Sequence, residues 1–236
     1  MSRVAADRLR VAFLAVTTLH LLAHATDVEL AQQLTKPLLM PALAAWVWAR
    51  GGPRVLVAAL FFGWGGDLAL QSGSDSFFLA GMASFAIGHI CYLALIRRAG
   101  SFTLRRSLPA AVGYAAVCAV MVTLLWPGLD PAMRVPVAGY SVLLTAMAWA
   151  ALAGVGGRVA AGGALFLLSD ALIATRLAEW QQLPAAGLWV MLTYTAAQYL
   201  LASGLLRAYA RRVSEGPESP AAASSSATSR RGATTR

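Results

Sequence analysis

The chain of 236 residues is 58% hydrophobic and 12% charged, with a formal net charge of +9, and its mean hydropathy is +0.64. About a quarter of the residues of a typical soluble domain are charged, so this composition excludes a water-soluble globular protein and indicates a polytopic membrane protein. Its apolar runs approach the length of a membrane-spanning helix, and the predicted fold class is therefore all-α.

Eight apolar segments follow one another along the chain. They are Leu9–His24, Thr35–Ala49, Val55–Gln71, Phe77–Ile96, Pro109–Trp126, Val135–Ala153, Val159–Ala178 and Ala185–Leu206. Turn-forming stretches such as Gly51-Gly52-Pro53 separate them. Most segments approach the roughly 20 residues that a helix needs to cross a bilayer. We therefore predict a domain of about eight transmembrane helices over residues 1–210.

The two ends of the chain call for separate interpretations. Ala23-His24-Ala25 imitates a signal-peptide cleavage site, but histidine is unusual in such a peptide, so we expect the first segment to remain as a helix. From Arg211 the chain reads RRVSEGPESPAAASSSATSRRGATTR, a low-complexity sequence rich in serine and alanine. Such a sequence has too few apolar residues to build a core, so residues 211–236 are predicted to form a disordered cytoplasmic tail.

Basic residues are distributed unevenly between the two sides of the predicted bundle. With a cytoplasmic N-terminus, the cytoplasmic side holds 16 of them: Arg3, Arg8, Arg10, Arg50, Arg54, Arg97, Arg98, Arg105, Arg106, Arg158, Arg207, Arg211, Arg212, Arg230, Arg231 and Arg236. The opposite side holds Lys36, Arg134 and Arg176. Because cytoplasmic loops are enriched in Lys and Arg, both termini are predicted to be cytoplasmic, in a plasma (inner) membrane of bacterial type. The net charge then needs no nucleic-acid partner.

Two aspartates interrupt the apolar segments, Asp67 in FFGWGGDLAL and Asp170 in ALFLLSDALIA. A carboxylate in hydrocarbon is costly, so it normally has a partner or a function. Both segments start from the predicted cytoplasmic side, and the helical rise places each aspartate about 17–18 Å into the membrane. We therefore expect the two carboxylates to lie at one level, a little past the midplane.

Other polar residues fall near the same depth. His89 follows Gly81 and Phe85 on one helical stripe, and Tyr194 and Gln198 are four residues apart on one face. Hydrogen bonds between helices would explain any of them singly. Paired carboxylates are poorly suited to that role. In a low dielectric two close carboxylates cannot both ionise, so one keeps its proton and the pair offers an acid beside a base.

Five segments, in order, resemble the YhhN family of integral membrane lysoplasmalogenases. They are TKPLLMP with Lys36, GGDLAL with Asp67, FFLAGMASFAIGHICYLALI with His89 and Tyr92, GALFLLSDALIA with Asp170, and YTAAQYLLASGLL with Tyr194 and Gln198. The resemblance implies hydrolysis of the vinyl-ether bond of a lysoplasmalogen, a lysophospholipid of the bilayer, to a fatty aldehyde and a glycerophospho-alcohol. It implies neither a metal nor a cofactor.

Within this resemblance, Asp67 and Asp170 are expected to be the catalytic acid and base, because an enol ether must be protonated and then attacked by water. Contacts with the substrate are expected from Lys36, His89, Tyr92, Tyr194 and Gln198. Lys36 suits a phosphate group, or else it reaches toward the interface as lysines near helix ends do.

Two other functions fit parts of the pattern. His20 and His24 are four residues apart, and with His89 and the aspartates they suggest a zinc-dependent membrane amidase or esterase. Aspartates in the third and seventh segments also suggest a proton-coupled transporter of a small solute or lipid, built from two repeats of four helices.

Overall fold

The computed structural model describes residues 3–100 and 104–214 of the chain. Its helices are α1 (Arg3–Ala25), α2 (Glu29–Ala49), α3 (Arg54–Leu70), α4 (Asp75–Ala99), α5 (Leu104–Leu125), α6 (Pro131–Gly154), α7 (Gly157–Leu177) and α8 (Ala186–Ser214), with a 3₁₀ turn, η1 (Trp126–Gly128). The predicted all-α fold class and the number of helices are confirmed.

Several helices extend past the apolar segments that predicted them. α2 begins at Glu29 rather than Thr35, and α8 continues to Ser214. Hydropathy marks only the apolar part of a helix, whereas backbone hydrogen bonding continues through Glu, Gln and Arg, which favour helix. Residues 211–214 are therefore helical, which corrects the predicted start of the tail at Arg211. The remainder of that predicted tail lies outside the described residues.

The chain is a multi-pass integral membrane protein. Among the described helices, four stretches that make up most of α4 to α7 are long and apolar enough to cross a membrane: Ser76–Ala99, Ser107–Gly128, Pro131–Gly154 and Gly157–Leu177. α3 has 17 residues and a length of about 26 Å. For α1, α2, α3 and α8, crossing of the membrane remains a prediction.

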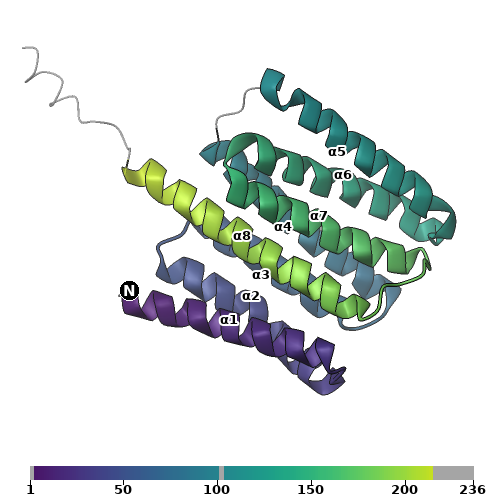
Figure 1. Cartoon of the computed structure of the whole chain (residues 1–236), viewed down its shortest axis with the longest axis horizontal. Coiled ribbons are helices and arrows are strands. Elements are labelled where there is room, and N and C mark those ends of the chain that lie inside the picture. Colours follow the sequence, from purple (N-terminus) through teal and green to yellow (C-terminus); the bar gives the residue numbers. More distant parts are fainter. Residues whose placement is uncertain (1–2, 101–103, 215–236) are drawn as a thin grey trace, which may run out of the picture.

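Helices that follow one another in the chain run antiparallel, with α1 and α2 at one edge of the bundle and α5 at the other (Figure 1). The closest neighbours are α3 with α4, α7 with α8, and α1 with α2. α8 also packs on α1, α2 and α4, and its buried residue Leu201 belongs to the main core together with Leu43, Leu60 and Ile96. α5 packs mainly on α6 and so lies at the periphery of the bundle.

Figure 1 shows the start of α1 and the end of α8 at the same end of the bundle. Together with the distribution of arginines, this arrangement leads us to expect both termini in the cytoplasm, with residues 72–76 on the far side. Reporter fusions after Ala210 and within residues 72–76 test this topology. A translocated C-terminus would contradict it and change the number of crossings by one.

Glycines set the close approach of α3 to α4. A Cβ added at Gly66 would lie 2.4 Å from Cε2 of Phe85, and one added at Gly88 would lie 3.2 Å from the carbonyl oxygen of Ala59. Small residues at helix contacts let two backbones approach closely. The glycines beside Asp67 therefore help to position its helix against α4.

We expect Gly66→Ala to lower the thermal unfolding temperature, because overpacking a well-packed contact costs about 1–3 kcal/mol. The matched control is Gly113→Ala on α5, where an added Cβ meets no atom within 4 Å. That change is expected to be neutral or slightly stabilising, since alanine favours helix over glycine. Unfolding of both variants in detergent makes the comparison, and equal unfolding temperatures would contradict the expected contact.

Candidate active site

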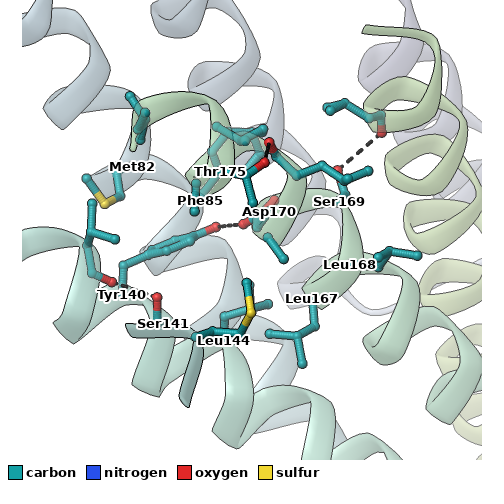
Figure 2. A pocket seen from close by; sticks show the side chains of 18 of the residues that line it. Met82, Phe85, Tyr140, Ser141, Leu144, Leu167, Leu168, Ser169, Asp170 and Thr175 are labelled. Atoms are coloured by element: carbon teal, nitrogen blue, oxygen red, sulfur yellow. Dashed lines mark hydrogen bonds between the residues drawn. The ribbon is translucent and has the colours of Figure 1, made fainter. Parts of the chain in front are cut away.

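A cavity of about 540 Å³ lies inside the bundle, and both aspartates line it. Its walls come mainly from α4, α5, α6 and α7, and most of the lining side chains are apolar (Figure 2). A concave, mostly apolar site with a few convergent polar groups is typical of small-molecule binding, and this volume lies within the usual range for such sites.

Asp67 is buried at the wall of this cavity, with 3% of its surface exposed. It accepts a hydrogen bond of 2.7 Å from the hydroxyl of Tyr194 on α8. The Tyr194 hydroxyl accepts one from Nε2 of Gln198 at 3.3 Å, and Oε1 of Gln198 accepts one from the hydroxyl of Tyr92 at 2.5 Å. A continuous chain of hydrogen bonds therefore runs from α4 through α8 to the carboxylate on α3.

Asp170 is held by a second, shorter chain of hydrogen bonds. Its Oδ2 accepts a hydrogen bond from the hydroxyl of Tyr140 on α6 (Figure 2). Nε2 of His89 lies 3.0 Å from the same hydroxyl. Since that hydroxyl gives its proton to Asp170, its oxygen accepts from the Nε2–H of His89. The Nδ1 atom of His89 is then the unprotonated nitrogen, and it is buried without a hydrogen-bond partner among residues 3–100 and 104–214.

The two carboxylates are thus supported in the same way by different helices. Each carboxylate accepts a hydrogen bond from a tyrosine hydroxyl, Asp67 from Tyr194 and Asp170 from Tyr140. The oxygen of each tyrosine lies within hydrogen-bond distance of a side-chain nitrogen, that of Gln198 for Tyr194 and that of His89 for Tyr140. Within the described residues no hydrogen bond joins Asp67 directly to Asp170. Proton sharing between them stays a prediction, although both carboxylates line one cavity.

Aromatic rings fill the space between the two chains of hydrogen bonds. The ring centroid of Phe166 lies 4.6 Å from that of His89 and 5.6 Å from that of Tyr194, edge to face in both cases. Phe85 packs on Phe166 and Tyr194 in the same manner. Edge-to-face packing stabilises such pairs.

The five predicted substrate-binding residues fall into two groups. Lys36 and Tyr194 line the cavity. His89, Tyr92 and Gln198 are buried behind its wall. His89 and Gln198 hydrogen-bond Tyr140 and Tyr194 respectively, and Tyr92 donates to Gln198. Their placement favours a positioning role over contact with a substrate.

Lys36 precedes two prolines inside α2, Pro37 and Pro41. Proline has no N–H, so the carbonyl groups of Gln33 and Pro37 lose their usual helical partners. Two side chains of the α3 region replace these partners. Nε1 of Trp64 donates to the carbonyl oxygen of Pro37 at 2.8 Å. Nε2 of Gln71 donates to that of Gln33 at 3.3 Å. These bonds fix the turn that carries Lys36.

Tyr140 lines the cavity and donates a hydrogen bond to Asp170, and the sequence did not predict it as a site residue. The predicted segment began at Val135, whereas α6 begins at Pro131. A start at Pro131 would have placed the tyrosine one turn deeper, near the level of the aspartates. Asp130, whose carboxylate accepts a hydrogen bond from the backbone N–H of Ala132, was the available signal for this helix start.

The three histidines do not come together in one site. Nδ1 of His20 lies 2.7 Å from the hydroxyl of Thr35 on α2, and the His24 ring packs against that of His20, so these two histidines lie together on α1. His89 lies on α4, in the Asp170 chain of hydrogen bonds. In the part of the chain that the structure describes, no group of three His, Cys, Asp or Glu side chains is placed to hold a metal ion.

Fold and cavity together define a multi-pass helical membrane protein with a largely apolar cavity that two carboxylates line. Residues 31–205 match the YhhN family, and the chain belongs to that family, which confirms the resemblance found in the five segments.

Its relatives include the human protein named lysoplasmalogenase TMEM86B, 35% identical over 178 residues that cover 74% of this chain and 75% of the human one. The rat protein of the same name is 36% identical over 180 residues, which cover 73% of this chain and 71% of the rat one. No solved structure is significantly similar to this chain.

Proposed function

We propose that this protein is a lysoplasmalogenase, which hydrolyses the vinyl-ether bond of a lysophospholipid inside the membrane. The observation that carries the proposal is the placement of Asp67 and Asp170 in the wall of one apolar cavity, each with a tyrosine hydroxyl donating to its carboxylate. The relatives named lysoplasmalogenase give the substrate class.

The reaction needs an acid and a base in turn. The acid protonates the vinyl carbon that is not bonded to oxygen, which leaves an oxocarbenium ion at the neighbouring carbon. Water adds there while the base takes its proton. In the resulting hemiacetal, the aspartate that took the proton of water protonates the glycerol oxygen while the other takes the proton of the hemiacetal hydroxyl. The carbon–oxygen bond breaks, a fatty aldehyde and a glycerophospho-alcohol are released, and the aspartate pair returns to its starting state. One protonated and one ionised aspartate supply both functions, and proton transfer of this kind typically contributes 10²–10⁴-fold to rate.

The tyrosines support either assignment of acid and base. A hydrogen bond donated to a carboxylate favours its ionised form, so the carboxylate left after protonation of the substrate is stabilised by Tyr140 or by Tyr194. The apolar lining strengthens these interactions because few water molecules share the cavity. His89 and Gln198 orient the two hydroxyl groups from behind.

Lys36 gives the cavity a positive charge for the phosphate of the substrate. Its side chain lines the same cavity as Asp67 and Tyr194. A lysine binds phosphate as a point charge and does not select a particular head group by shape.

Aldehyde release from purified protein tests the proposal. The protein in nanodiscs is given a vinyl-ether lysophospholipid, and the matched control is the saturated alkyl-ether analogue, which has no double bond to protonate. We expect a fatty aldehyde from the first lipid alone. Uptake of the intact lipid into proteoliposomes without any aldehyde would contradict the proposal and favour the proton-coupled transporter.

Activity is expected to survive metal chelation, because two aspartates supply both acid and base. His20→Ala should likewise keep most of the activity, since the His20 side chain contacts Thr35 and His24 rather than the cavity. The measurement is aldehyde release before and after treatment with a chelator. Loss of activity that added zinc restores would favour the metal-dependent amidase or esterase.

A further inference from the structure

One face of α5 forms a wall of the cavity. The α5 residues that line it are Tyr114, Val117, Cys118, Met121, Val122 and Leu125. Their spacing of three and four residues is that of a single helical stripe. The stripe spans about 17 Å at the helical rise of 1.5 Å per residue.

This face lines a cavity because α5 is packed loosely against the bundle. In the apolar window of α5 only 6% is buried inside the protein, compared with 44% for α4. α5 packs mainly on α6 and stands at the edge of the bundle, opposite α1 and α2 (Figure 1). The space beside it therefore belongs to the ligand site rather than to a helix contact.

The cavity has a polar side and an apolar side. Lys36 on α2, Asp67 on α3 and Tyr194 on α8 come from helices that pack on one another. Asp170 and Tyr140 come from α7 and α6, the helices on which α5 packs. Across the bundle, the cavity passes from the side with Lys36 and Asp67, past Asp170 and Tyr140, to the mostly apolar stripe of α5.

A lipid with one hydrocarbon chain likewise has a charged part, its phosphate head group, and an apolar part, its chain. Its phosphate suits the side with Lys36, and its hydrocarbon chain suits the stripe, since burial of apolar surface is favourable by about 25 cal/mol per Å². We propose that the cavity-facing stripe of α5 binds the hydrocarbon chain of the substrate and limits the chain lengths that the enzyme accepts. The identity of that lipid rests on the function proposed above.

Met121→Trp tests the chain site by reducing the space beside the stripe. The matched control is Val120→Trp, because Val120 is adjacent in sequence but 56% exposed and does not line the cavity. Using vinyl-ether lysolipids of increasing chain length, we expect Met121→Trp to lower kcat/KM for the longest chains by about tenfold relative to the shortest. Val120→Trp should keep the wild-type profile. An unchanged profile in Met121→Trp, or an equal loss at all lengths, would overturn the proposal.

Cys118 provides a second measurement that needs neither turnover nor a bulky variant. Cys118 lines the cavity, whereas Cys91 on α4 does not. The chain has two cysteines, so in a Cys91→Ser protein any modification by a thiol reagent occurs at Cys118. In nanodiscs, the uncleavable alkyl-ether lysolipid is expected to slow modification of Cys118 by a maleimide at least threefold. The free glycerophospho head group should not.

The two measurements separate this inference from the proposed reaction. Protection of Cys118 in a protein that releases no aldehyde would support binding of the hydrocarbon chain by α5 and refute the proposed hydrolysis. Aldehyde release without protection of Cys118 by the lipid would support the proposed hydrolysis and overturn the proposed role of α5.

Discussion

Asp67→Asn and Asp170→Asn are each expected to abolish aldehyde release while the protein remains folded. Asparagine has nearly the shape of aspartate and keeps hydrogen bonds, but it neither donates an acidic proton nor accepts one as a base. The expected loss is about 10²–10⁴-fold in kcat, the usual contribution of a general acid or base. Asp67→Glu should also be weak, because Asp67 is buried and an added methylene displaces the acid in a packed site.

The matched control for both variants is Asp130→Asn. Asp130 caps α6 by accepting a hydrogen bond from the backbone N–H of Ala132, and asparagine caps a helix about as well as aspartate. This variant should therefore keep both fold and activity. Well-folded Asp67→Asn and Asp170→Asn proteins with wild-type turnover would refute the acid–base mechanism. Loss of folding together with activity would instead indicate a structural role for the carboxylates.

Tyr140→Phe and Tyr194→Phe are expected to lower kcat by about 10- to 100-fold, because a hydrogen bond to a charged group contributes about 1.5–3 kcal/mol. Each change removes the hydroxyl that donates to one aspartate and leaves the ring in place. We expect KM to change much less than kcat, since the carboxylates act on the chemical step rather than on binding.

Tyr199→Phe is the control for these changes. The Tyr199 ring stacks with Phe13 and Trp46, and that stacking does not depend on the hydroxyl. Steady-state kinetics of the three variants make the comparison. Tyr140→Phe and Tyr194→Phe proteins with the kcat of Tyr199→Phe would show that the hydroxyl groups do not support the catalytic carboxylates.

Much of the polar site was predictable because charge is conspicuous in an apolar sequence. Asp67 and Asp170 were predicted because a carboxylate in hydrocarbon is energetically costly and because the helical rise puts both at one depth in the membrane. The structure places both in the wall of one cavity. The order of hydrogen bonds was not predictable. Gln198 lies near the predicted depth of the aspartates, but only the packing of α4 on α8 shows that Tyr92 hydrogen-bonds Gln198 and that Gln198 hydrogen-bonds Tyr194.

The apolar wall of the site could not be predicted at all. α5 is apolar around most of its circumference, so its sequence has no polar face that would reveal which side meets a ligand. The prolines of α2 are similar: Pro37 is visible as an anomaly, but its compensation by Trp64 depends on the contact between α2 and α3. Tertiary packing decides both features.

Hydrolysis in D₂O tests protonation of the vinyl carbon most directly. The purified protein is given a vinyl-ether lysolipid in D₂O, the aldehyde is trapped at once as a hydrazone, and its mass is measured. Transfer of a solvent-derived proton from an aspartate to carbon predicts a single deuterium on the carbon next to the carbonyl, and Asp67→Asn and Asp170→Asn should form no such product. An aldehyde without deuterium, or labelled aldehyde formed equally well by both asparagine variants, would contradict acid–base catalysis by this aspartate pair.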